Sequence, residues 1–251
     1  MRFIGQTERI TQNRIVQLFK EQLHYHYLGN WEDRYNNQNI EESLLQGFLE
    51  KQGHIQVLIT RAIKQLKDAA SDPNESLYNN NKKTYSLLRY GAKVKAEAGD
   101  NYETVQFIDW KNPEANHFAI AEEVTVLGNR EKRPDIVLFL NGIAIGVLEL
   151  KRSTVSIGDG IRQSITNQQK EFIQPFFSTV QFVFAGNDTE GLRYGTIGTG
   201  EKYYLKWKEG ESDEGRYQVD KYLLKMCNKQ RLLELMYDFV LFDGGVKKLP
   251  R

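Results

Sequence analysis

The stretch RPDIVLFLNGIAIGVLELKR, residues 133–152, constrains the fold of this chain more than any other segment. Two apolar runs flank Asn141-Gly142, which is the strongest short-range signal for a β-hairpin. Charged residues stand at the outer ends of both runs: Asp135 begins the first, and Glu149 and Lys151 end the second. Strand ends commonly carry solvated charges, and such a spacing arises by chance in many proteins. The rest of the chain must therefore distinguish a solvated hairpin end from a chemical site.

Hydrophobic periodicity divides the chain into a helical first part and a strand-rich middle. Helical spacing predicts helices at residues 7–23, 42–52, 57–66, 161–172 and 220–239. Strand-like patterns occur in ETVQFIDW, HFAIAEEVTVLG, the hairpin and TVQFVFAG. Asn39 with Glu42 predicts a capping box, and NNNKK (79–83) and SIGDG (156–160) predict breaks. This order predicts an α/β (α+β) fold, with a mixed, mostly antiparallel sheet flanked by helices and a helical N-terminal portion.

Composition and charge narrow the class of protein. With 40% hydrophobic and 27% charged residues over 251 positions, the chain has the composition of a soluble globular protein. The net charge is +1, so a nucleic-acid surface would have to be a local basic patch. The single cysteine, Cys227, gives no disulfide framework and no zinc site. The polar start MRFIGQTERITQN is not a signal peptide, and no apolar run approaches the ~20 residues of a membrane span. We therefore expect a cytoplasmic protein that binds no membrane.

The three charges at the hairpin end have a consistent chemical interpretation. Asp135 and Glu149 offer two carboxylates to a hard divalent cation such as Mg²⁺, which prefers oxygen ligands. Such a cation lowers the pKa of a water and neutralises charge on a phosphate that is being cleaved. Lys151 lies two residues after Glu149 and so on the same strand face, where its ammonium can position the water or stabilise the transition state. Basic residues that could contact the phosphate are Lys132, Arg133, Arg152 and Arg162.

This constellation is the catalytic pattern of the PD-(D/E)xK nucleases, and the chain resembles one family of them. The hairpin, the SIGDGIRQ after it, the preceding FAIAEEVTV and the earlier LLRYG resemble the N-terminal nuclease region of the restriction (R) subunit of type I restriction–modification enzymes. The closing LFDGGVKKLPR resembles the segment that joins this nuclease to an ATP-driven motor. The resemblance implies Mg²⁺-dependent cleavage of double-stranded DNA, with methylation and specificity subunits as partners. It also implies a helical portion at 1–92, a PD-(D/E)xK core at 93–208, and a helix and linker at 209–251.

The resemblance suggests further site residues and leaves alternatives open. A QxxxY motif often follows Glu-x-Lys in this family; Gln163 fits it, but Asn167 stands at the tyrosine position. Glu8 matches an acidic residue near the metal, although the helix dipole equally explains a glutamate in a first turn. The chain contains no GxxxxGK[ST], so ATP binding would belong to the missing motor domain. The alternatives are another PD-(D/E)xK nuclease of the repair or resolvase type, and a catalytically silent domain that only binds DNA or docks partner subunits.

The metal interpretation makes a geometric demand on the hairpin. If regular strands followed a two-residue turn at Asn141-Gly142, Asp135 would pair with Leu148 and point away from Glu149. A three-residue loop, a bulge or a bent strand end would instead place the two carboxylates on one face. They would then lie within about 3–5 Å of each other, because one cation must touch both. We therefore predict an irregularity between Asp135 and Glu149.

Overall fold

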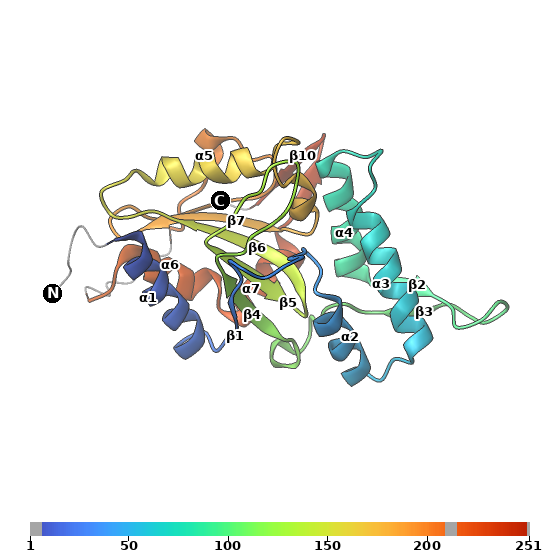
Figure 1. The fold of residues 1–251 in the computed structure, drawn as a ribbon. Helices are drawn as coiled ribbons and strands as arrows, with labels where there is room; N and C mark the ends of the chain where they lie inside the picture. Colours follow the sequence, from blue (N-terminus) through green and yellow to red (C-terminus); the bar gives the residue numbers. More distant parts are fainter. Residues whose placement is uncertain (1–6, 209–214, 250–251) are drawn as a thin grey trace.

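Figure 1 shows the computed structural model of the chain, which describes residues 7–208 and 215–249. Its centre is a six-stranded sheet in the order β1-β4-β5-β6-β7-β8. The strands are β1 (His26–Asn30), β4 (Phe118–Glu122), β5 (Ile136–Leu140), β6 (Ile143–Leu150), β7 (Phe182–Asn187) and β8 (Gly191–Gly195). The β1–β4 and β6–β7 pairs are parallel, and the β4–β5, β5–β6 and β7–β8 pairs are antiparallel. The predicted α/β fold with a mixed, mostly antiparallel sheet is confirmed, and it is consistent with a PD-(D/E)xK-like core.

Helices cover both faces of the sheet and one of its ends (Figure 1). They are α1 (Glu8–Glu21), α2 (Glu42–Lys51), α3 (Gln56–Ala70), α4 (Leu77–Tyr90), α5 (Ile157–Asn167), α6 (Gln218–Met226) and α7 (Lys229–Asp238). α5 lies on one face, whereas α1, α6 and α7 pack into the core on the other. α2, α3 and α4 stand together at the end nearest the β5–β6 turn. Within the described ranges, no helix has the length and apolar character needed to cross a bilayer.

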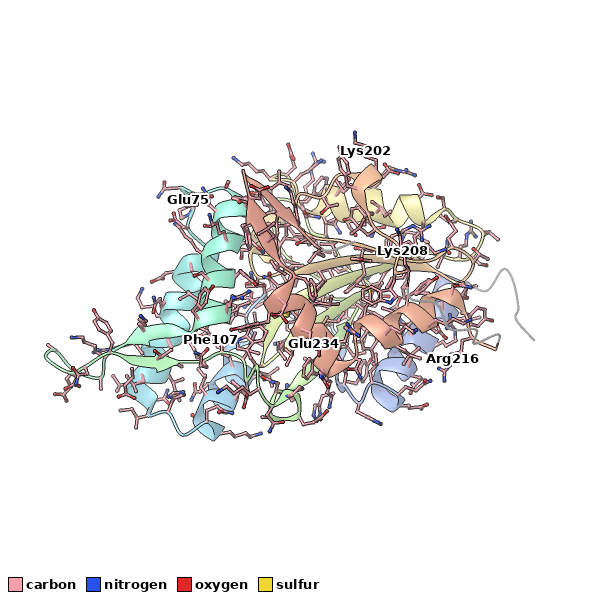
Figure 2. The ribbon with its side chains drawn as sticks, turned by 180° about the vertical axis from the view of Figure 1, so that it is seen from behind. Glu75, Phe107, Lys202, Lys208, Arg216 and Glu234 are labelled. Atoms are coloured by element: carbon pink, nitrogen blue, oxygen red, sulfur yellow. The ribbon has the colours of Figure 1, made fainter. Side chains whose placement is uncertain are left out.

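Smaller elements complete the fold. Two short antiparallel ladders join β2 (Ala92–Val94) to β3 (Glu103–Val105) and β9 (Leu241–Asp243) to β10 (Val246–Lys248). The 3₁₀ turns are η1 (Pro113–Ala115), η2 (Gln174–Ser178) and η3 (Glu201–Tyr203). Seen from behind in Figure 2, α6 and α7 lie in front of the sheet.

The two central strands are apolar on both faces because both faces are covered. Every residue of β5 and β6 is buried. One core cluster contains Leu138 and Leu148 together with residues of α1 and α6, and a second contains Val137 and Val147 together with residues of α5. This burial on both sides explains why the hairpin consists of almost uninterrupted apolar runs.

Several sequence-based predictions of helix ends need correction. α1 lies where its periodicity predicts it, but NNNKK is not a loop, because it falls inside α4. SIGDG is not a break either, since Ser156 Oγ accepts a hydrogen bond from the Gly158 N–H and caps α5. The predicted last helix is two helices, α6 and α7. Asn228 separates them, and its side chain caps α7 by accepting from the Arg231 N–H.

The hairpin turn, and not a capping box, fixes the start of α2. The Asn39 amide donates to Ser178 Oγ at 2.9 Å, and α2 begins after Glu41 without a side-chain cap, so the predicted capping box is wrong. The Glu41 N–H donates to the Gly142 carbonyl at 2.7 Å. Gly142 has a φ of +85°, and a Cβ on it would lie 2.7 Å from the Glu41 carbonyl oxygen. Glycine is therefore required where the turn and α2 meet.

The C-terminal hairpin β9–β10 is fastened to the domain by a buried lysine. Lys247 is 3% exposed, and its Nζ donates to Asn81 Oδ1 at 2.8 Å and to Gln181 Oε1 at 2.6 Å. Burial lowers the pKa of Lys247 well below its usual range. Phe242 of β9 packs against Tyr85 of α4. The hairpin is thus tied both to α4 and to the residue that precedes β7. The predicted boundary at residue 209 lies outside the described residues.

Candidate metal centre

The β5–β6 hairpin contains the irregularity that the sequence predicts. Asn141 and Gly142 form a two-residue turn with φ of +51° and +85°. The register then shifts by one residue between Leu138 and Phe139 of β5, which leaves Ile145 of β6 as an extra residue. Such an insertion is a β-bulge, and it reverses the side-chain alternation of the strand beyond it.

The bulge turns the end of β6 so that the two acids share a face. Ile145 and Leu148 are three residues apart and yet pack into the same core cluster, which regular alternation forbids. Ile136 pairs with Leu148, so the preceding Asp135 stands opposite Glu149. The predicted irregularity between the two carboxylates is confirmed.

Both acids are buried, and their charges are only partly compensated. Asp135 is 8% exposed, Glu149 is fully buried, and Asp135 Oδ2 accepts a hydrogen bond from the Leu150 N–H at 2.6 Å. Burial raises the pKa of Asp135 to about 6, although the Leu150 N–H and the charge of Lys151 lower it. Burial also raises the pKa of Glu149 well above its usual range, and repulsion from Asp135 raises it further. The pair therefore favours the binding of a cation or a proton.

Helix α5 places two side-chain amides on Glu149. Gln163 Nε2 donates to Glu149 Oε2 at 2.8 Å, and Asn167 Nδ2 donates to Glu149 Oε1 at 3.2 Å. The two amides are four residues apart and so lie on one face of the helix. The helix contacts the strand directly, since a Cβ on Gly160 would lie 3.7 Å from Glu149 Cβ. Asn167, which occupies the tyrosine position of the family motif, thus reaches the same carboxylate as Gln163.

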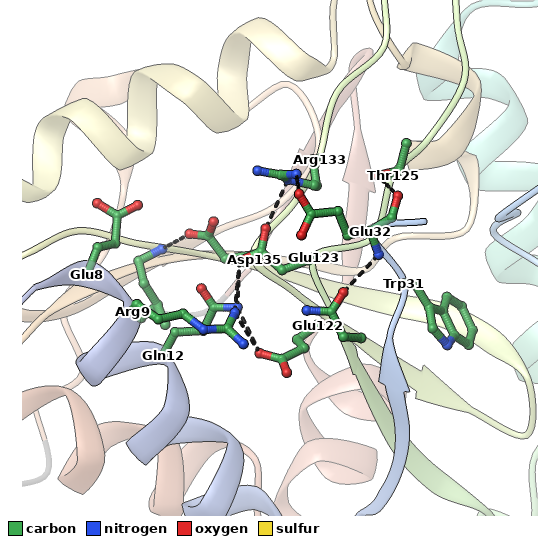
Figure 3. Close-up of polar contacts among 12 residues, drawn as sticks. Glu8, Arg9, Gln12, Trp31, Glu32, Glu122, Glu123, Thr125, Arg133 and Asp135 are labelled. Atoms are coloured by element: carbon green, nitrogen blue, oxygen red, sulfur yellow. Dashed lines mark hydrogen bonds and ion pairs between the residues drawn. The ribbon is translucent and has the colours of Figure 1, made fainter. Parts of the chain in front are cut away.

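Helix α1 brings a third acid to the group through a lysine. The side chain of Lys151 is 13% exposed, and its Nζ is 3.4 Å from Glu8 Oε1. The side chain of Glu8 is 41% exposed (Figure 3). Its charge contributes to the raised pKa of Asp135. The structure thus brings together five residues selected from the sequence: Asp135, Glu149, Lys151, Gln163 and Glu8.

Two further acids, at the end of β4 and just after it, escaped the sequence analysis. Glu122 is 5% exposed and accepts from Gln12 Nε2 at 3.0 Å, and the same amide donates to Glu123 Oε1 at 2.9 Å (Figure 3). The Glu123 N–H donates to the Asp135 carbonyl at 2.9 Å. These bonds fix α1, and with it Glu8, beside the start of β5. The acidic pair that ends FAIAEE was a visible signal, whereas Gln12 has no distinctive sequence context.

The arrangement agrees with a comparison with known protein families. A family model described as the type I restriction enzyme R protein N terminus matches residues 5–202. The chain belongs to this family.

Individual relatives of this R-protein N-terminal domain carry matching names. The chain is 25% identical over 210 residues to a Methanocaldococcus jannaschii protein named as the type I restriction enzyme MjaIXP endonuclease subunit, covering 72% of this chain and 20% of that protein. A second protein of that organism, named for MjaVIIIP, is 31% identical over 156 residues, covering 59% and 14%. The HindI endonuclease subunit of Haemophilus influenzae is 25% identical over 191 residues, covering 71% and 18%. The aligned part is a fifth or less of the length of each of these curated relatives.

The basic residues selected as DNA contacts differ in what they bind within this R-protein domain. Arg133 and Arg162 each form two ion pairs with carboxylates of the chain. Lys132 Nζ lies 4.3 Å from the centroid of the Phe172 ring. Arg152 is exposed, and within the described ranges it forms no ion pair. Arg152 therefore has its charge available, whereas Arg133 and Arg162 would have to exchange a carboxylate for a phosphate.

The acidic pair of the R-protein domain fits Mg²⁺ by its donor type. Mg²⁺ takes oxygen ligands and is commonly held by one or two carboxylates together with waters. Asp135 and Glu149 supply two carboxylates whose pKa values are both raised by burial, and repulsion from Asp135 raises that of Glu149 further. Among the residues that the structure describes, no group of three or more His, Cys, Asp or Glu side chains is arranged to hold a metal. The fit therefore depends on these two carboxylates.

Proposed function

We propose that the chain is the Mg²⁺-dependent endonuclease domain of a type I restriction enzyme R subunit, and that it hydrolyses phosphodiester bonds in double-stranded DNA. The observation that carries the proposal is the burial of Asp135 and Glu149 on one face, beyond the bulge at Ile145, with Lys151 next to them. Two buried carboxylates repel each other at neutral pH, and a divalent cation relieves that repulsion. Membership of the R-protein family and likeness to subunits named as endonucleases support the same reaction.

Each residue of the group has a distinct role in this proposal. Asp135 and Glu149 hold the Mg²⁺, with Glu8 as a candidate additional ligand. A bound Mg²⁺ supplies Lewis-acid chemistry, lowering the pKa of a water and neutralising phosphate charge. Gln163 orients the Glu149 carboxylate through its 2.8 Å hydrogen bond. Lys151 presents its ammonium to the attacking water or to the charge that develops on the phosphate in the transition state.

In this proposal the domain makes some of the contacts with DNA, and other parts of the complex make the rest and bind ATP. Lys132, Arg133, Arg152 and Arg162 contact the DNA backbone, which positions the duplex without reading its sequence. A net charge of +1 gives the domain little long-range attraction for DNA, so its methylation and specificity partners must hold the duplex. ATP binding belongs to the motor region of the full-length subunit.

Metal binding tests the proposal without requiring the complete enzyme. Titration of the chain with Mn²⁺ followed by calorimetry should reveal one site, and Asp135→Ala should abolish it. Asp68→Ala is a matched control because Asp68 is an exposed carboxylate on α3 whose partner within the described ranges is Lys64, four residues away. Equal Mn²⁺ affinity of Asp135→Ala and the unmodified chain would refute the metal site. A catalytically silent DNA-binding domain would bind DNA and show no Mn²⁺ site in either protein.

A further inference from the structure

Three buried polar atoms in α5 and in the residue that follows η3 have no hydrogen-bond partner among the described residues. They are Asn167 Oδ1, Ser164 Oγ and Tyr204 Oη. Asn167 is 1% exposed, Ser164 is fully buried and Tyr204 is 8% exposed. A buried polar group without a partner destabilises the folded state, and most buried polar groups in native proteins are paired with protein or ordered water. One of the three atoms belongs to Asn167, whose amide is bonded to the buried Glu149, so its missing partner bears on that carboxylate.

Two of the three groups belong to α5, and the third, Tyr204, follows η3, which contacts α5. Ser164 and Asn167 are three residues apart and so lie on the same face of α5. Tyr204 follows η3 and belongs to the core cluster that also contains Ile157 and Ile161 of α5. Tyr204 thus packs on the face of the sheet that α5 covers.

Glu149 connects the tyrosine to the metal centre. Besides burial, the charge of Glu149 raises the pKa of the Tyr204 hydroxyl, so the two groups interact electrostatically. Asn167 contacts Glu149 directly through its Nδ2. Asn167 therefore contacts this carboxylate as a donor, whereas Tyr204 interacts with it electrostatically and has its hydroxyl unpaired.

The unpaired atoms are chemically complementary. A carbonyl oxygen only accepts, so Asn167 Oδ1 needs a donor, and the hydroxyls of Ser164 and Tyr204 are donors without an acceptor. The orientation of the Asn167 amide also depends on Oδ1. If the amide rotated by half a turn, its oxygen would face the Glu149 oxygen that now accepts a hydrogen bond. A donor on Oδ1 would hold Nδ2 toward Glu149.

We propose that Tyr204 is a positioning residue for the metal ligand Glu149. The Tyr204 hydroxyl donates to an ordered water that Ser164 also contacts, and this water donates to Asn167 Oδ1. The hydrogen bond on Oδ1 keeps Asn167 Nδ2 directed at the Glu149 carboxylate. A polar space between two to four partners is where proteins hold such a water. Groups that orient a metal ligand affect affinity strongly even though they never touch the metal. The inference rests on the proposed function, since it assigns Glu149 to a metal.

The test compares two neighbouring tyrosines. Tyr204→Phe keeps the buried ring and removes only the hydroxyl, and Tyr203→Phe makes the same change on a side chain that is 58% exposed. In ¹H–¹⁵N spectra of the whole chain, the side-chain amide signals of Asn167 are identified by their loss in Asn167→Asp. We expect Tyr204→Phe to shift these signals and to weaken Mn²⁺ binding about tenfold. Tyr203→Phe should leave both unchanged.

Each outcome separates this inference from the function on which it rests. Unchanged Asn167 signals in a folded Tyr204→Phe protein would overturn the hydrogen-bonded connection. Shifted signals with an unchanged Mn²⁺ affinity would overturn the positioning role. Failure of the unmodified chain to bind Mn²⁺ would overturn the proposed function and with it the positioning role, whatever the spectra of the variants show. Denaturant unfolding of each variant establishes that it is folded.

Discussion

Replacing Asp135 by Asn should stabilise the metal-free protein and weaken its response to metal. The asparagine oxygen can still accept the hydrogen bond from the Leu150 N–H, so the change removes mainly a buried charge. Burial raises the pKa of Asp135 from its ordinary value of 3.8 to about 6. At about 1.4 kcal/mol per pKa unit, this difference is worth about 3 kcal/mol of folding free energy. The folded state keeps a proton that the unfolded state loses between about pH 4 and pH 6, so wild-type stability falls as pH rises through that range.

The assay is thermal or urea unfolding at pH 5 and pH 8, in EDTA and in saturating Mg²⁺. At pH 8 in EDTA, Asp135→Asn should be more stable by up to about 3 kcal/mol, or about 6–12 °C in Tm for a chain of this size. The difference should shrink at pH 5. Mg²⁺ at a hundredfold excess over its Kd should add about 2.7 kcal/mol to the wild type alone. The control Asp68→Asn should change stability by less than about 0.5 kcal/mol, because its ion pair is exposed. An Asp135→Asn protein no more stable than wild type at pH 8 in EDTA would refute this account of the buried pair.

Three further predictions follow from the same site. Alanine at Asp135, Glu149 or Lys151 should each abolish DNA cleavage by the assembled restriction enzyme, and a double variant should be little worse than a single one, because the three act as a unit; cleavage at the wild-type rate by Lys151→Ala would contradict this. The chain alone should hydrolyse no ATP and should bind DNA weakly, with an affinity that falls steeply with salt in a filter-binding assay; tight binding of one particular duplex would argue against it. Deletion of Ile145 should leave Mn²⁺ binding in place and reduce stability in urea, because Leu138 still pairs with Gly146 and Asp135 still stands opposite Glu149, whereas the buried contacts of Ile145 are lost; loss of Mn²⁺ binding by a folded deletion variant would contradict this register.

Local features of the hairpin could be predicted from the sequence because their causes are local. Asn141-Gly142 adopts the positive φ values that its turn requires. A metal bound by both Asp135 and Glu149 requires the two side chains to point to the same face, and this requirement fixed the register of the two strands. Gly146, inside an otherwise apolar strand, was an additional signal for the bulge. The constellation of Asp135 and Glu149 was accessible because both residues belong to a single hairpin.

Other features were not predictable because distant segments determine them. NNNKK has the composition of a loop, yet Asn81 is fully buried in α4 and its amide donates to the carbonyls of Phe177, Ser178 and Val180. Its polarity satisfies the backbone of a segment almost 100 positions away. Asn167 and Gln12 are ordinary polar residues whose importance appears only when α5 and α1 are placed against the sheet.

The buried Lys247 of the β9–β10 hairpin determines which parts of the domain would resist a pulling force on β10. In R subunits longer than this chain, tension on the following polypeptide would act first on β10. There it would meet Lys247, whose Nζ must leave Asn81 and Gln181 before the hairpin can peel away. Gln181 directly precedes β7, and β7 pairs with β6 at Ala185 opposite Glu149. A force on β10 would therefore be transmitted through Lys247 and Gln181 to β7, the strand that pairs with β6 at Glu149.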